Sequence, residues 1–287
     1  MTSSLSKEEL INLAQNLNPF GDLKTTISIG DFSFTFCNLK KEQKDFLEES
    51  YRGFILEEKE SCIKVETGKL EKEIEREKSD FDLLHYDEKS FLTSHYFIAS
   101  REDNEKKCKL QFVENNEKYL LFAVENFLRW MISELAIKRH GLLLHASSKV
   151  LDGNAHIFLG NHEAGKSTAV SLIDEGFTIA DDVVLVMFKE NCHYAYTMPS
   201  VTKFVQNEKE IGKYKVKAFY KLVKSNENKL KKLTKPLAFA VVVSSVPFLV
   251  STNRHHYIAK NLIERVPVYE LHFKKEKGFF KEALKNL

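Results

Sequence analysis

The chain has 287 residues, of which 43% are hydrophobic and 29% charged, ordinary values for a globular protein of one large or two modest domains. A formal net charge of +2 excludes a global electrostatic field that would attract nucleic acid or an anionic membrane. The four cysteines are scattered without a CxxC pair, which favours reduced thiols in a cytoplasm over a disulfide framework.

The first residues predict a helix rather than a secretory signal. Ser6 and Glu9 have the spacing of a capping box, and Glu8 and Glu9 stand where a signal peptide needs its apolar segment. The longest apolar run, residues 236–250, is short for a bilayer and rich in valine. We therefore expect buried strands there, and a soluble cytoplasmic protein that spans no membrane.

Short elements follow in the first part of the chain. Residues 25–36 alternate in hydrophobicity around Gly30-Asp31, which predicts a β-hairpin with a two-residue turn. The other expected elements are a helix over 41–55, a strand over 61–68, a solvated charged stretch over 69–80, and a hairpin with strands at 95–100 and 109–114.

A long helical pattern then separates two parts of the chain. Apolar residues recur every three or four positions over 117–138, which predicts a core-facing helix in which Trp130 packs rather than stacks on a ligand. The protein is expected to be α/β, of mixed α+β type. We place an N-terminal α+β domain for partner or substrate recognition at 1–115, a linking helix at 116–138 and a nucleotide-binding domain at 139–287.

The second part is expected to open with two strands joined by a turn, residues 141–147 and 155–160. A strand over 177–188 comes later, after a helix that Gly176 can end. A lysine-rich polar stretch, the valine-rich strands and a closing helix near 276–286 follow.

Residues 160–167, GNHEAGKS, fit the pattern GxxxxGK[ST] at every fixed position. Two glycines let the chain curl so that backbone N–H groups cradle phosphate oxygens, and the helix that follows points its N-terminus at the same anion. Lys166 adds a charge for the terminal phosphates, and Ser167 offers a hydroxyl to Mg²⁺. We predict a site for ATP, with GTP as the alternative; an incidental glycine turn or a decayed loop is the competing interpretation. The residues assigned to the nucleotide are Gly160, Asn161, His162, Glu163, Ala164, Gly165, Lys166, Ser167 and Thr168.

Two adjacent carboxylates, Asp181 and Asp182, precede the apolar run VVLV. Neighbours on a strand point to opposite faces, so the two acids need not share one role. One could hold Mg²⁺ beside Ser167, and the other could accept a proton from an attacking hydroxyl. The competing interpretation is a turn or strand start with exposed acids.

The series RHGLLLHAS, a short turn, GKST, EGF and ADDVV resembles the catalytic domain of HPr kinase/phosphorylase. It is more similar to the broader set of HPr-kinase-related proteins, which are often found beside peptide-modification genes. The similar region runs from Arg139 to Met187, and VPVYELHF with Phe279-Phe280 gives a weaker similarity near the end of the chain. This resemblance implies a P-loop kinase core related to phosphoenolpyruvate carboxykinase. Residues 188–204 lack the signature that such enzymes use to dock HPr, so HPr is not the expected substrate.

The resemblance also implies roles for individual residues. Asp181 would be the base that activates an acceptor hydroxyl, Asp182 and Ser167 would bind Mg²⁺, and His140 would lie near the transferred phosphate. His145 is a further pocket candidate. Glu163 departs from the family, which commonly has glycine there; a carboxylate repels phosphate, and a side chain disfavours positive φ.

The remaining basic residues have simpler interpretations. Lys203 is the nearest basic residue that could face the transferred phosphate, and the alternative interpretation is a surface lysine. His255-His256 is expected in a loop and His272 in a strand with a structural role. No set of residues has zinc-ligand spacing.

Together these patterns predict a Mg-ATP-dependent kinase that transfers the γ-phosphoryl group to a hydroxyl, with Lys166 stabilising charge. The acceptor is expected to be a serine of a small molecule, a peptide or a protein. The alternatives are a non-catalytic nucleotide-binding accessory or sensing module of a peptide-modification system, and a structural protein with a vestigial loop. Neither nucleic acid nor membrane is an expected partner, and a homo-oligomer is left open.

Overall fold

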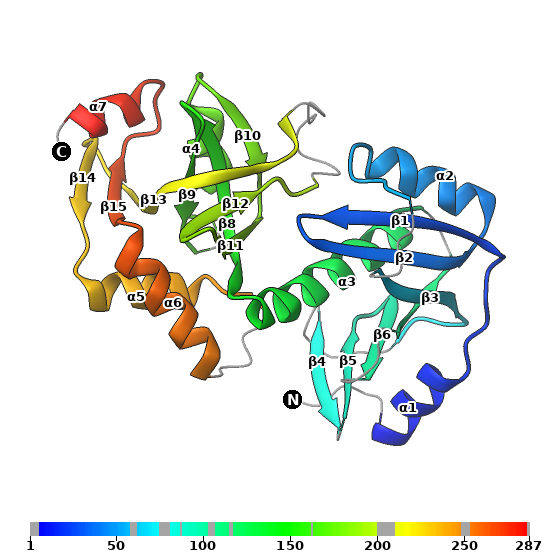
Figure 1. Cartoon of the computed structure of the whole chain (residues 1–287). Helices are drawn as coiled ribbons and strands as arrows, with labels where there is room; N and C mark the ends of the chain where they lie inside the picture. The colour runs from blue at the N-terminus through cyan, green and yellow to red at the C-terminus, as the bar shows by residue number, and fades with distance from the viewer. Residues whose placement is uncertain are drawn as a thin grey trace. The chain divides into compact units, whose positions relative to one another are not determined.

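The computed structural model describes residues 6–57, 62–74, 81–86, 88–102, 107–114, 117–161, 163–199, 210–247 and 253–285. The chain divides into two compact units, residues 1–131 and 132–287. Each unit has its own mixed β-sheet with helices, so the protein is a mixed α/β protein (Figure 1). No helix among the described residues is long and apolar enough to cross a membrane.

The first unit has one seven-stranded sheet in the order β1-β2-β3-β7-β6-β5-β4. Strands β2, β3 and β7 run parallel to one another, and the other neighbours pair antiparallel. Its elements are α1 (Lys7–Gln15), β1 (Leu23–Ile29), β2 (Phe32–Leu39), α2 (Lys41–Ser50), β3 (Ile63–Leu70), β4 (Asp82–Tyr86), β5 (Lys89–Thr93), β6 (Phe97–Glu102), β7 (Lys107–Val113) and the first part of α3 (Glu117–Lys138).

The strongest local patterns of this unit form the expected elements. Helix α1 begins with the predicted capping box, in which the Glu9 N–H donates to Ser6 Oγ (3.2 Å) and the Ser6 N–H donates to Glu9 Oε2 (2.7 Å). Strands β1 and β2 form the predicted hairpin, and Gly30 at its turn has a φ of 58°. The hairpin expected at 95–100 and 109–114 is formed by β6 and β7.

Other elements of this unit differ from expectation. Helix α2 ends at Ser50 rather than residue 55, because the chain turns at Gly53 (φ 81°) and then pairs Ile55 with Ile27. Strands β4 and β5 are additional to the predicted elements. Residues 69 and 70 of the charged stretch belong to β3, and residues 75–80 lie outside the described residues.

Helix α3 packs on the sheet of the first unit through aromatic side chains. Phe127 meets Phe34 and Phe36 edge-on, with ring centroids 6.0 and 5.8 Å apart. Trp130 is fully buried beside Phe127. Trp130 is therefore a core residue, as predicted.

The second unit has an eight-stranded sheet in the order β10-β8-β11-β12-β13-β15-β14, with β9 paired to both β8 and β13. Its elements are β8 (Gly141–Leu151), β9 (Asn154–Leu159), α4 (Lys166–Ser171), β10 (Phe177–Ala180), β11 (Val183–Lys189), β12 (Cys192–Tyr196), β13 (Lys213–Lys224), β14 (Lys229–Lys232), α5 (Lys235–Ser244), α6 (Asn253–Arg265), β15 (Val268–Phe273) and α7 (Phe279–Lys285).

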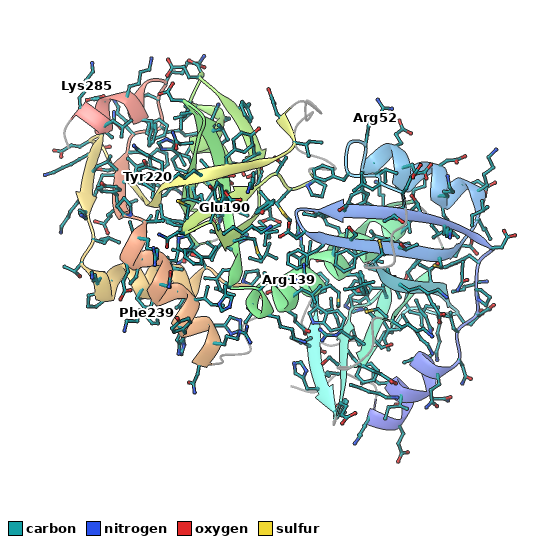
Figure 2. All side chains as sticks on the ribbon, viewed as in Figure 1. Arg52, Arg139, Glu190, Tyr220, Phe239 and Lys285 are labelled. Atoms are coloured by element: carbon teal, nitrogen blue, oxygen red, sulfur yellow. The ribbon has the colours of Figure 1, made fainter. Side chains whose placement is uncertain are left out.

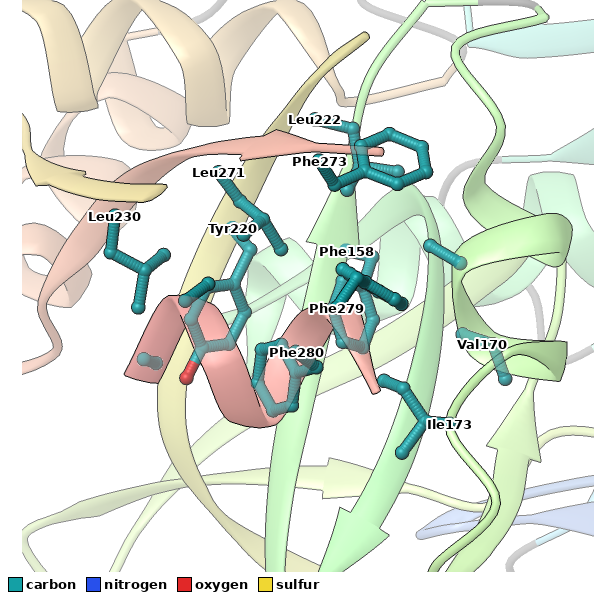
Figure 3. Packing of buried hydrophobic residues seen from close by; sticks show 13 residues of the cluster. Phe158, Val170, Ile173, Tyr220, Leu222, Leu230, Leu271, Phe273, Phe279 and Phe280 are labelled. Carbon is teal, nitrogen blue, oxygen red and sulfur yellow. The ribbon is translucent and has the colours of Figure 1, made fainter. Parts of the chain in front are cut away.

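An aromatic core joins α4 and α7 to the sheet of this unit (Figure 3). Tyr220 of β13 is 2% exposed and stacks on Phe158 of β9 with centroids 5.3 Å apart; its place inside the unit is visible in Figure 2. Phe280 of α7 lies edge-on to both rings. Burying each large apolar side chain contributes about 1.5–3 kcal/mol, so this core fixes the end of β9 and the start of α4.

Two expectations in this part of the second unit were wrong, namely the strands from residue 236 and the loop at His255-His256. The apolar run from residue 236 forms helix α5 instead of strands; it follows an extended Thr234, and Pro236 lies in the first turn, where proline is tolerated. The lysine-rich stretch contains β13 and β14, because its lysines alternate with buried residues. His255-His256 belongs to helix α6 rather than to a loop. Residues 248–250 and 205–209 lie outside the described residues.

Candidate nucleotide and phosphate site

The loop after β9 makes a tight curl before α4. A Cβ atom at Gly160 would lie 2.6 Å from the Cβ of Ala164, so only glycine fits there without movement. The Ala164 N–H donates to the carbonyl of Asn161 (3.1 Å) and closes the turn. The expected strand–loop–helix order is present, although α4 ends at Ser171, before Gly176. His162, assigned to the same loop, lies outside the described residues.

Two residues of the curl have left-handed backbone conformations. Gly165 has a φ of 92°, which glycine adopts readily, and Glu163 has a φ of 64°. An L-residue other than glycine pays about 1–2 kcal/mol for this conformation. The exposed Glu163 therefore occupies a position whose backbone favours glycine.

The ammonium group of Lys166 lies inside the curl. Lys166 is only 8% exposed, and its Nζ donates to the carbonyls of Gly160 (2.9 Å) and Asn161 (3.2 Å). Burial of a charged amine is costly unless it is hydrogen-bonded. The loop's own carbonyls therefore hold this cation in place. Thr168 follows in the first turn of α4 and is half-buried.

Asp181 and Asp182 interrupt the path of β10 and β11 along β8. Phe177 pairs with Val150 and Val183 with His145, so both strands run antiparallel along β8. Asp182 has a φ of 86°, and its carbonyl accepts from the Ala146 N–H (3.0 Å). The expectation of one continuous strand with the two acids on opposite faces was therefore wrong.

Asp181 joins the loop to the sheet. Its Oδ1 accepts hydrogen bonds from Ser167 Oγ of α4 (2.9 Å) and from Ser147 Oγ of β8. Ser147 is completely buried and was absent from the predicted site. The alternation of HAS, which puts Ser147 and His145 on one face of a strand, was the available signal.

Asp182 faces His145. His145 Nδ1 lies 3.3 Å from Asp182 Oδ1, and the two side chains are 35% and 26% exposed. His145 was only a pocket candidate in the sequence, yet it is the histidine that contacts the acidic pair. Ser147 and His145 therefore bring both carboxylates to one face of β8, although Asp181 and Asp182 are adjacent in the chain.

His140 directly precedes the first residue of β8. Its carbonyl accepts from the Phe188 N–H (3.3 Å), at the far end of β11 from Asp182. His140 stands seven positions before Ser147, which corresponds to about 23 Å at 3.3 Å per residue. The structure thus brings Ser167, Asp181, Asp182 and His145 together and leaves His140 outside this group.

The described residues contain no group of three or more histidine, cysteine or acidic side chains that could hold a metal ion alone. A serine hydroxyl and carboxylates are nevertheless the oxygen donors that Mg²⁺ takes, commonly with only one or two carboxylates beside phosphate oxygens. The set around Ser167 fits an ion that arrives with a nucleotide.

Comparison with known proteins gives the family. Among solved structures, the HPr(Ser) kinase/phosphatase from Coxiella burnetii is 16% identical, with a TM-score of 0.26 over 42% of this chain and 88% of that one. No curated protein matches the sequence. A family model described as SynChlorMet cassette protein ScmC matches residues 107–287, more than half of the chain. The protein therefore belongs to the ScmC family of SynChlorMet cassette proteins.

Proposed function

We propose that this ScmC-family protein binds a magnesium nucleotide at residues 160–168 and transfers the γ-phosphoryl group to a hydroxyl. The contact between Ser167 Oγ and Asp181 Oδ1, 2.9 Å, carries the proposal. It unites the loop with the acidic pair, although the two residues are separated by a helix and a strand. Phosphoryl transfer needs such a convergence, because its catalysis is mostly positioning and charge stabilisation.

Within this proposal Ser167 and Asp181 hold the metal ion. Bound Mg²⁺ would neutralise charge on the phosphate oxygens. Ser167 Oγ and Ser147 Oγ both donate to Asp181 Oδ1, and these hydrogen bonds orient the carboxylate toward the place proposed for the metal. The resemblance to HPr-kinase-related proteins assigns the metal to Ser167 and Asp182 instead, so the two acids exchange roles between these assignments.

Asp182 then serves as the base. Its carboxylate can accept the proton of an acceptor hydroxyl, and His145, 3.3 Å away, keeps it in place. Both side chains are partly exposed, so an acceptor can reach them from solvent. A positioned base of this kind typically contributes a factor of 10²–10⁴ to the rate.

Lys166 and the loop amides supply the phosphate contacts. The Lys166 ammonium is now held by two loop carbonyls, and a phosphate is a stronger, charged partner for it. We therefore expect Lys166 to exchange a carbonyl for a phosphate oxygen when the nucleotide binds. Left-handed residues such as Glu163 and Gly165 occur in anion-binding nests, although the Ala164 N–H between them donates to the Asn161 carbonyl in this structure.

Single substitutions separate the two assignments of the acidic pair. Asp182→Asn should lower transfer from γ-labelled ATP to a library of peptides and small hydroxyl compounds by at least about 10², while Mg²⁺-dependent nucleotide binding persists. Asp181→Asn should abolish the Mg²⁺ dependence of binding. The matched control is Asp174→Asn, an exposed carboxylate paired with Lys277 outside this site.

Each result has a defined consequence. Exchanged phenotypes for the two variants would establish Asp181 as the base and Asp182 as the metal ligand. Full activity in both variants would remove the acidic pair from the mechanism. Nucleotide binding without transfer by the wild-type chain would favour the non-catalytic accessory module, for which the closed, carbonyl-bound state of Lys166 is the supporting observation.

A further inference from the structure

A cavity lies beyond the end of α4, between the turn of the β8–β9 hairpin and helix α7. Its volume is about 380 Å³, within the range of about 300–1,000 Å³ that small-molecule sites occupy. Helix α4 begins at Lys166, and the cavity wall includes Leu172 and Ile173, which follow its last turn. The cavity is therefore at the opposite end of α4 from the phosphate loop.

Apolar side chains form the inner wall of this cavity. Ile173 and Phe280 belong to the aromatic core of the second unit and are 7% and 3% exposed (Figure 3). Leu151 and Leu172 are half-buried against that core, and Leu284 of α7 is 38% exposed. A ligand with an apolar body can therefore remove exposed leucine surface from water, which favours binding.

The segment after α4 is held in place by β8. Lys149 of β8 is 7% exposed, and its Nζ donates to the carbonyls of Val170 (3.2 Å) and Ile173. Gly176 has a φ of 68°, and a Cβ atom there would lie 1.8 Å from the carbonyl oxygen of Val150. The wall is thus shaped before a ligand arrives, so binding costs little ordering entropy.

The rim of the cavity carries an excess of negative charge. Three carboxylates line it, those of Asp152, Asp174 and Glu175, against the single ammonium group of Lys281. Asp174 pairs with Lys277 (3.0 Å) and Glu175 with Lys281. The rim therefore attracts a cation and repels an anion.

Asp152 is the rim carboxylate that lacks a counter-charge. It is exposed at the hairpin turn, and its carbonyl accepts from Asn154 Nδ2 (2.9 Å), whereas its carboxylate has no hydrogen bond or ion pair among the described residues. An ammonium group in the cavity would give this carboxylate a partner.

His156 adds a polar group to the apolar wall. Burial lowers its pKa to about 4; Lys217 lowers the pKa further and Asp152 raises it. The imidazole is therefore neutral at pH 7. Its Nδ1 is hydrogen-bonded to Tyr220 Oη (2.9 Å), while its Nε2 is neither paired among the described residues nor shielded from solvent. With the proton on Nδ1, Nε2 can accept a hydrogen bond from an ammonium group.

We propose that this cavity binds a small-molecule amine, with one ammonium group on a compact apolar body. The ammonium pairs with the Asp152 carboxylate and donates to His156 Nε2, and the apolar body lies against Leu172 and Leu284. The carboxylate rim repels a nucleotide triphosphate. This site is therefore distinct from the proposed nucleotide site and does not depend on the proposed function.

Three ligands of similar shape and different charge test the proposal, namely phenethylamine, 2-phenylethanol and phenylacetate. Titration of the full chain is followed by the methyl NMR signals of Leu172 and Leu284. We expect phenethylamine to bind with a Kd on the order of 1 mM. The neutral alcohol should bind about fivefold more weakly, because it lacks the exposed ion pair, and phenylacetate should bind most weakly. High salt should reduce the preference for the amine.

Substitutions at the rim and the wall separate charge from apolar contact. Asp152 has a φ of 49°, which asparagine tolerates, so Asp152→Asn should fold normally and bind phenethylamine no better than the alcohol. Leu284→Ala should weaken both ligands alike. The matched control is Glu190→Gln, an exposed carboxylate with the same φ that pairs with Lys213 outside the cavity; it should keep the preference for the amine.

Three results would overturn the proposal. The first is equal affinity of the wild-type chain for phenethylamine and 2-phenylethanol. The second is a preference for the amine that persists in Asp152→Asn. The third is binding of phenethylamine that leaves the signals of Leu172 and Leu284 unchanged, because the ligand would then lie elsewhere.

Discussion

The two ends of β11 hold polar side chains in opposite states. At one end, Asp181 accepts hydrogen bonds from two serines, and His145 pairs with Asp182. At the other end, His193 is more deeply buried than these acids, yet it has no hydrogen-bond partner among the described residues. The same sheet thus carries one paired and one unpaired polar group.

The difference in hydrogen bonding predicts how each end responds to a substitution. Leaving a buried donor or acceptor unpaired costs about 1–3 kcal/mol, so folded proteins pair nearly all such groups. The paired end is satisfied without a ligand, and under the proposed function its contacts would exchange when a nucleotide binds. The unpaired end holds a buried imidazole whose removal breaks no hydrogen bond among the described residues. Substitutions at the two ends should therefore act in opposite directions.

The largest effect is expected from Lys166→Met. This variant removes the cation that two loop carbonyls hold and that the proposed function assigns to phosphate, and it keeps a side chain of similar length. Loss of one preorganised charge typically costs a factor of about 10²–10³ in rate, and nucleotide affinity should fall as well. Transfer kinetics and nucleotide titration measure both. A variant with wild-type affinity and rate would show that the closed loop has no role in phosphate binding.

Acid should destabilise the second unit through two buried histidines. Burial lowers the pKa of both His193 and His156 to about 4. The positive charge of Arg265 lowers the pKa of His193 further. For His156, Lys217 lowers the pKa and Asp152 raises it. The unfolded chain protonates each histidine near pH 6.5, whereas the folded chain does not.

The free energy of unfolding is therefore unaffected by these groups above pH 6.5. It falls between pH 6.5 and 4 by up to about 1.4 kcal/mol per pH unit for each histidine. Urea unfolding at several pH values measures the slope, and His193→Phe should remove the share of His193. If the free energy of unfolding of that variant depends on pH as steeply as in the wild type, the lowered pKa of His193 would be contradicted.

Ser147→Ala is expected to destabilise the protein by about 1.5 kcal/mol. It removes a buried hydroxyl that donates to the Asp181 carboxylate, and hydrogen bonds to charged groups contribute about 1.5–3 kcal/mol. Ser148→Ala is the matched control, because Ser148 is equally buried but its Oγ has no partner among the described residues. The control should leave the urea midpoint unchanged or raise it. Equal losses in both variants would mean that serine burial alone sets the effect.

Sequence reasoning succeeded where local chemistry decides the structure. The capping box at Ser6, the hairpin turn at Gly30 and the α3 periodicity depend on neighbours in the chain. The loop at 160–167 belongs to the same class, because its glycines and lysine act on their own backbone.

Register and long-range pairing could not be predicted in the same way. His140 and His145 are both plausible from spacing, and only the alignment of β8 with β11 places His145 beside Asp182. Ser147 joins the site through a partner 34 positions away. The valine-rich α5 shows that apolar content alone does not separate a buried helix from strands, since both need the same side chains.

The smallest expected effect concerns Glu163, where charge and backbone can be separated. Glu163→Ala removes the carboxylate but keeps a side chain at a φ of 64°, so it should tighten nucleotide binding with little change in stability. Glu163→Gly also removes the left-handed penalty of about 1–2 kcal/mol. Part of that gain is offset by about 0.4–1 kcal/mol of extra freedom in the unfolded chain. The glycine variant should therefore be more stable than the alanine variant by roughly 0.5 kcal/mol in urea unfolding. If the alanine variant is as stable as the glycine variant, the backbone at residue 163 relaxes without cost. Repulsion between Glu163 and phosphate would then be the only reason to prefer glycine at this position.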